Sequence, residues 1–123
     1  MAETLPDLIR DQARKIGFDS VGITTAEADP CQMSSLTTYL EDGRHGDMAW
    51  MAETIERRSS PKGLWPQVRS VIVLGTSYAP ADDPRSLLDH PTRGLISVYA
   101  RNKDYHDTVK KRLKHLARWL VGQ

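Results

Sequence analysis

Residues 94–106 read GLISVYARNKDYH, and this stretch predicts the junction around which the rest of the chain is organised. Its first half is apolar, as in a strand, and it turns polar at Arg101 before a helix expected to begin near Lys103. A strand that ends in polar side chains can present them to a ligand, although an ordinary helix cap has the same pattern. The presented set is Arg101, Asn102, Asp104, Tyr105 and His106.

The helix expected at 103–121 is the most strongly patterned element. At about 100° per residue, one narrow arc is apolar and the neighbouring arc is basic. His106 falls within the apolar arc, so we expect its side chain to point inward, either as a hydrogen-bonded core residue or toward a ligand. The apolar arc holds Val109, Leu113, Leu116, Ala117 and Leu120, and the basic arc holds Lys110, Lys111, Lys114 and Arg118.

Working outward, periodicity predicts an α+β fold with a small central sheet flanked by helices. The run Val71–Leu74 is β-branched and unbroken, which is typical of a strand buried on both faces. Asp47 is the expected cap of one helix, and Ser60 with Pro61 is expected to start a short helical turn. The strands are expected at 20–24, 69–78 and 94–100, and the helices at about 4–16, 34–42, 47–57 and 103–121.

Composition limits the function classes. The chain has 123 residues, 39% of them hydrophobic, with a mean hydropathy of −0.50 and a single cysteine, Cys31. No apolar run approaches the roughly 20 residues of a membrane span, and no secretory signal is recognisable, so a cytoplasmic protein without a membrane partner is expected. One cysteine excludes an internal disulfide and an all-cysteine cluster, and the four histidines do not fall at zinc spacings, so no metal site is expected.

Charge is unevenly distributed. Residues 1–100 carry ten basic and fourteen acidic side chains, whereas residues 101–123 carry seven and two. Such a basic segment is typical either of a surface that meets a polyanion or of an ordinary solvated helix face. The sequence also stops shortly after the strongly patterned helix, and we therefore expect either an artificial boundary chosen for expression or a truncated reading frame.

Three stretches together resemble one family. HGDMAWM at 45–51, RRSSPKGLWPQVRSVIVLG at 57–75 and SVYARNKDYH at 97–106 are similar, in order and spacing, to epoxyqueuosine reductases. The resemblance covers essentially all 123 residues and implies the N-terminal cobalamin- and substrate-binding domain of a longer reductase. It implies a cobalamin-binding fold related to nitroreductases, and reduction of the epoxide of epoxyqueuosine in tRNA to queuosine.

The resemblance also implies residue roles. Arg58 is expected to contact an anionic group of cofactor or substrate, and Asp104, Tyr105 and His106 to line the cobalamin and queuosine pocket. Val98 stands where many members have arginine, so Arg101 is expected to supply that contact. Asn102 replaces a frequent glycine and suggests a slightly different turn.

Other parts of the machinery are expected elsewhere. The resemblance implies that the general acid, the ligands of two [4Fe–4S] clusters and the tRNA-binding repeats follow Gln123. No catalytic residue is therefore expected in this chain, and the rest of the same protein is an expected partner. Lys110, Lys111, Lys114 and Arg118 are expected to contribute weakly to tRNA binding.

Two other functions remain compatible with the residues. One is a non-catalytic module that binds tRNA or another polyanion through the basic helix, which would make its affinity strongly salt-dependent. The other is a flavin-binding, nitroreductase-like domain. Absorbance after addition of cobalamin or flavin separates the flavin domain from the cobalamin enzyme.

Overall fold

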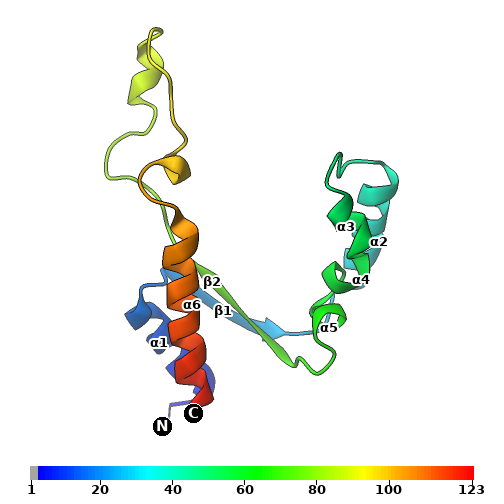
Figure 1. Ribbon diagram of the computed structural model, residues 1–123. Helices are drawn as coiled ribbons and strands as arrows, with labels where there is room; N and C mark the ends of the chain where they lie inside the picture. Colours follow the sequence, from blue (N-terminus) through cyan, green and yellow to red (C-terminus); the bar gives the residue numbers. More distant parts are fainter. Residues whose placement is uncertain (1–2) are drawn as a thin grey trace. The chain divides into compact units, whose positions relative to one another are not determined.

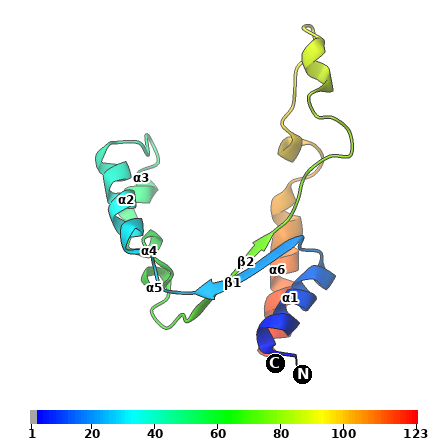
Figure 2. The same ribbon diagram turned by 180° about the vertical axis from the view of Figure 1, so that it is seen from behind.

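The computed structural model describes residues 3–123, which form two compact units (Figures 1 and 2). The described residues up to Gly22, together with Leu74–Gln123, form the first unit, and Ile23–Val73 form the second. The elements in order are α1 (Leu5–Ile16), β1 (Ser20–Thr25), α2 (Pro30–Glu41), α3 (Ala49–Glu53), α4 (Ile55–Arg58), α5 (Pro61–Leu64), β2 (Ser70–Gly75), the 3-10 turns η1 (Ser86–Asp89) and η2 (Val98–Ala100), and α6 (Tyr105–Val121).

Strands β1 and β2 form a two-stranded antiparallel sheet, which confirms the α+β class. The Asp19 amide donates to the Gly75 carbonyl at 2.9 Å at one end, and the Ala26 amide donates to the Arg69 carbonyl at 3.1 Å at the other. The predicted burial of β2 on both faces is wrong, because Val73 is 57% exposed. The apolar run shows a preference for extended backbone, but it does not show how many layers cover the strand.

The strand predicted at 94–100 is also wrong. Residues 94–97 form no regular element, and Val98–Ala100 form the turn η2. A strand requires a neighbour that accepts and donates its backbone hydrogen bonds, and in residues 3–123 the sheet consists of β1 and β2 alone. An alternating apolar pattern carries no information about whether such a neighbour exists.

The core of the first unit lies where α1 packs against α6, and both views show these helices side by side (Figures 1 and 2). Ala13, Phe18 and Leu116 are buried together, with partly buried apolar side chains around them. Helix α1 ends at Gly17, whose φ of +110° is the left-handed conformation that glycine adopts without strain. Gly17 also leaves room for the guanidinium of Arg112.

Helix α6 occupies nearly the predicted range but presents a slightly different face. The inward side chains are those of Val109, Arg112, Leu116, Trp119 and Leu120. Leu113 is 44% exposed and Ala117 is also exposed, so their predicted inward positions are wrong. The rotation follows from Arg112, which packs over Gly17 and takes an inward position that periodicity had given to Leu113.

In the second unit, local caps decide where helices begin. Helix α2 starts at Pro30, four residues before the prediction, because the Asp29 carboxylate accepts the Cys31 amide at 2.7 Å. The helix predicted at 47–57 is interrupted at Thr54, and its cap is Met48 rather than Asp47. Helix α5 begins as predicted, with the Ser60 hydroxyl accepting the Gly63 amide at 2.9 Å. None of the described helices combines the length and apolar character that crossing a membrane requires.

Candidate functional site

An apolar hollow of the first unit lies between the end of β2 and the start of α6. It has a volume of about 480 Å³. Three tyrosine rings contribute to its wall, so it offers flat apolar surface with hydroxyl groups at the ring ends. Its lining residues are Phe18, Leu74, Thr76, Tyr78, Tyr99, Tyr105 and Val109.

An adjoining hollow of about 340 Å³ shares much of this wall and adds a polar rim. Thr76, Tyr78, Tyr99, Tyr105 and Val109 are common to both hollows. The adjoining hollow is also lined by Arg101, Asn102 and Lys103. Two of the predicted residues, Arg101 and Tyr105, therefore line the same hollow. We call the two together the tyrosine hollow.

The rim of the tyrosine hollow is shaped by an unusual backbone turn. Asn102 has a φ of +71°, a left-handed conformation that asparagine tolerates better than most residues with a side chain. Thus asparagine at this position still makes a turn of the kind that glycine favours. The Arg101 side chain is half-buried, and its guanidinium lies 3.4 Å from the Ile96 carbonyl and 3.5 Å from that of Pro84, both long for hydrogen bonds.

Asp104 caps α6 and holds His106. Its carboxylate accepts the His106 amide at 2.9 Å and lies 2.6 Å from His106 Nδ1. The backbone hydrogen bond from His106, followed by the contact with its ring, lowers the pKa of Asp104 below its usual value. Asp104 is therefore an ionised acceptor at neutral pH and not a proton donor.

His106 does not point inward, and that prediction is wrong. Its side chain is 72% exposed, and its ring stacks on Tyr105 with centroids 4.3 Å apart. The helix begins at Tyr105, so His106 lies in the first turn and its ring folds back onto the capping carboxylate. When Nδ1 carries the proton that faces Asp104, Nε2 is the acceptor that remains for a ligand.

Asp104 and His106 flank Tyr105 but line neither part of the tyrosine hollow, and the predicted residues outside the stretch 101–106 are not in its lining either. Arg58 belongs to the second unit, where it contacts Trp50 and Thr54. The basic arc of α6 is exposed, and its side chains form no ion pair within residues 3–123. That arc consists of Lys110, Lys111, Lys114 and Arg118.

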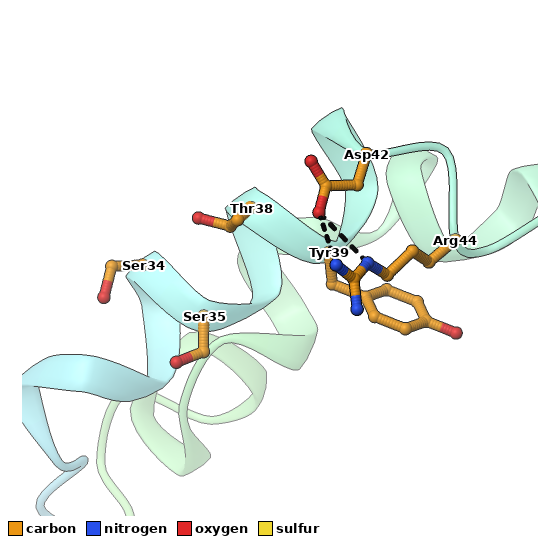
Figure 3. Close-up of a pocket in the computed structure, with 6 residues that line it drawn as sticks. All are labelled: Ser34, Ser35, Thr38, Tyr39, Asp42 and Arg44. Carbon is orange, nitrogen blue, oxygen red and sulfur yellow. Dashed lines mark hydrogen bonds and ion pairs between the residues drawn. The ribbon is translucent and has the colours of Figure 1, made fainter.

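Two groups of residues went unpredicted. Tyr78 and Tyr99 line the tyrosine hollow, and the signal for Tyr78 was its place just after a strand. A separate, polar hollow lies along α2 and the turn that follows it (Figure 3). There the Asp42 carboxylate pairs with the Arg44 guanidinium at 3.0 Å beside Tyr39. The signal for it was a pair of serines and a pair of threonines at 34–38, separated by Leu36. No group of three potential metal ligands occurs in the described part of the chain.

Comparison with known proteins connects these residues to a family. The model of the family described as epoxyqueuosine reductase QueG, DUF1730, matches residues 58–123. Epoxyqueuosine reductase of Pseudomonas aeruginosa is 38% identical over 114 residues, which are 92% of this chain and 31% of that protein. The enzyme of Gloeobacter violaceus is 39% identical over 113 residues, which are 91% of this chain and 34% of that protein.

The same relation extends to Escherichia coli, whose epoxyqueuosine reductase is 34% identical over 113 residues, 91% of this chain and 30% of that protein. The chain therefore spans about a third of the length of the curated relatives it matches. No solved structure matches the chain.

Proposed function

Since the chain belongs to the epoxyqueuosine reductase QueG, DUF1730 family, we propose that it is the cofactor- and substrate-binding part of an enzyme that reduces the epoxide of epoxyqueuosine in tRNA to queuosine. The fold belongs, in this proposal, to the cobalamin-binding class related to nitroreductases. The enzyme acts in the cytoplasm. The observation that carries the proposal is the tyrosine hollow with its polar rim. The stretch 97–106 supplies part of its lining, and all of its lining residues except Phe18 lie inside the segment matched by the family.

The chemistry of the tyrosine hollow suits part of a corrin. A corrin has a broad apolar face surrounded by amide side chains, and large ligands of this kind need apolar walls with a few placed polar groups. Tyr78, Tyr99 and Tyr105 supply the apolar walls. Arg101 and Lys103 supply donors for amide carbonyls at the rim. In this proposal the tyrosine hollow would hold part of the corrin, and the remainder of the enzyme would cover the rest.

Cobalamin, if bound in the tyrosine hollow, would supply the reducing chemistry at its cobalt. The residues of this chain bind and orient the reactants. Asp104, held ionised by the His106 amide, accepts a hydrogen bond from a hydroxyl or amine of the substrate. His106, oriented by Asp104, offers its exposed Nε2 edge to the substrate or to a corrin amide.

Two functions are assigned to the rest of the enzyme. Cys31 is the one cysteine of the chain, and a [4Fe–4S] cluster takes four cysteine ligands, so the clusters lie elsewhere. The acid that protonates the departing oxygen lies there as well. The chain by itself is therefore expected to yield no queuosine from epoxyqueuosine tRNA, cobalamin and a chemical reductant, as measured by mass spectrometry of the digested tRNA.

Cobalamin titration tests the binding role directly. We expect a saturable change in the visible absorption of cobalamin when the 123-residue chain is added, and a loss of affinity of about tenfold in Tyr99→Ala, because an aromatic wall is removed. Tyr39→Ala is the matched control, since Tyr39 lies in the second unit, and it should bind normally. Saturable binding of flavin mononucleotide, with none of cobalamin, would favour the nitroreductase-like alternative and refute the proposal.

A further inference from the structure

Arg58 is held in a fixed orientation by two residues one and two helical turns earlier. Its Nε donates a hydrogen bond to Thr54 Oγ1 at 2.8 Å. Its guanidinium carbon lies 4.2 Å from the centre of a Trp50 ring, which is a cation–π contact. The Thr54 hydroxyl in turn donates to the Trp50 carbonyl at 2.6 Å, so the acceptor for Arg58 is itself fixed.

The outer edge of this guanidinium has no protein partner. Among residues 3–123, the terminal nitrogens of Arg58 form no hydrogen bond and no ion pair, and the exposed side chain of Arg57 forms no ion pair either. Glu53 and Glu56 lie on the same two helices without pairing to these arginines. By contrast, four other arginines are each paired with an aspartate: Arg10, Arg14, Arg44 and Arg85.

The space beside Arg58 differs in charge on its two sides. One hollow of about 330 Å³ is lined by Thr54, Arg57, Arg58 and Leu64, and it contains no acidic residue. Another, of about 530 Å³, includes Asp29, whose carboxylate caps α2. An anion is therefore favoured in the first hollow, where two cations meet no carboxylate.

We propose that Arg58, supported by Arg57, binds a phosphodiester of the tRNA substrate. A guanidinium presents parallel N–H groups that match two oxygens of a phosphate, and it loses little freedom on binding when it is already oriented. Trp50 and Thr54 are positioning residues that act through Arg58. This assignment rests on the proposed function, because tRNA is the ligand that supplies the phosphodiester.

The test compares variants that keep or remove the charge. An RNA stem-loop with the sequence of a tRNA anticodon arm is titrated with the 123-residue chain at several salt concentrations. Arg58→Lys keeps the charge but loses the paired donors, so we expect an affinity about five- to tenfold weaker with an unchanged salt slope, a factor typical of the loss of one hydrogen bond. Arg58→Gln should also reduce the slope by about 0.7 to 0.9, the value for one phosphate contact.

Thr54→Val tests the positioning. It removes the hydroxyl that orients Nε while leaving both arginines, so we expect a loss of about two- to threefold at unchanged slope. The matched control is Arg44→Lys in the same unit. Arg44 is exposed and already paired with Asp42, as Figure 3 shows. The affinity of the Arg44→Lys variant for the stem-loop should therefore stay within about twofold of the parent's. Circular dichroism melts confirm that each variant is folded.

A titration with inorganic phosphate tests the phosphate site independently of tRNA binding, on which the proposed function depends. We expect phosphate to shift the Nε–H resonance of Arg58 in ¹⁵N spectra and to leave that of Arg44 unchanged. A shift at Arg58 without any stem-loop binding would support the phosphate site and refute tRNA as its source. An affinity and a salt slope that are the same in the parent, Arg58→Lys and Arg58→Gln would overturn the proposal, as would the absence of a shift at Arg58.

Discussion

The two units of the chain position their functional side chains by different means. The first unit has an interior in which Ile9, Ala13, Phe18 and Leu116 are buried, and its tyrosine hollow borders that interior through Phe18. In the second unit, the buried residues among those described are Ala26 and Ser59. Its short helices are held by caps and by contacts four residues apart, such as that between Thr54 and Arg58.

This difference indicates which kind of ligand group each unit can meet. Apolar walls require neighbours that keep them in place, and packing in the first unit supplies these neighbours. An oriented arginine needs only one acceptor and one aromatic face, which a few turns of helix can supply without an interior. Disruption of the interior should therefore affect the tyrosine hollow strongly, whereas loss of a cap in the second unit should have small and local effects.

The largest effect is expected for Leu116→Ala. Leu116 is 3% exposed at the packing of α1 against α6, and truncation of a buried leucine costs about 2–5 kcal/mol of unfolding free energy. Leu113→Ala, on the same helix at a 44% exposed position, should cost less than about 1 kcal/mol. Urea unfolding followed by Trp119 fluorescence, with Trp50 and Trp65 replaced by Phe, reports on the first unit. Equal losses for the two variants would show that α6 is not packed as described.

A smaller effect is expected for Ser60→Ala in the second unit. The Ser60 hydroxyl accepts the Gly63 amide at the start of α5, and loss of such a cap costs about 1 kcal/mol. Amide hydrogen exchange should become faster in residues 61–65, while the Trp119 unfolding curve stays unchanged. A shift of the Trp119 midpoint as large as that in Leu116→Ala would mean that the two units are not independently stabilised.

The smallest effect is a pH dependence at the start of α6. The pKa of Asp104 lies below its usual value of 3.8, chiefly because the carboxylate accepts the His106 amide. Because the pKa of Asp104 is lower in the folded state than in the unfolded state, the ionised carboxylate stabilises the fold at pH values above 3.8. This stabilisation is lost as the pH falls through the pKa of the folded state. A carboxyl ¹³C titration should place the midpoint below 3.8, and the His106 amide shift should follow it. In Asp104→Asn that acid-dependent shift should disappear, whereas a midpoint at or above 3.8 in the parent would contradict the cap.

Strong local signals in the sequence were enough to predict several elements. Helical periodicity predicted α1 and α6, and Ser60 with Pro61 predicted α5. Alternation of apolar residues predicted β1, and an unbroken β-branched run predicted β2. The start of α2 had the same kind of signal in Asp29 and Pro30, but the helix was expected to begin only at residue 34. The strand at 94–100 failed for another reason, because pairing depends on a neighbour that no local pattern shows.

The candidate site was predictable only in part. Arg101 and Tyr105 do line one hollow, since they flank the turn that leads into α6. The orientation of His106 was not predictable, because a helical wheel assumes that the first turn points like the rest, whereas the Asp104 cap captures the ring. Trp50, Thr54 and Arg58 are spaced four residues apart, as contacts on one helix face require. These contacts were not predicted, because the helix is interrupted at Thr54 and the sequence does not show whether the spacing continues across the interruption.

Hydrogen exchange of the 123-residue chain with and without cobalamin tests most directly whether the tyrosine hollow is the cofactor-binding part. We expect cobalamin to slow amide exchange at residues 76–78 and 98–109, which line or flank the hollow, and to leave residues 30–60 unchanged. Slower exchange confined to residues 30–60, or no change anywhere at saturating cobalamin, would contradict this assignment.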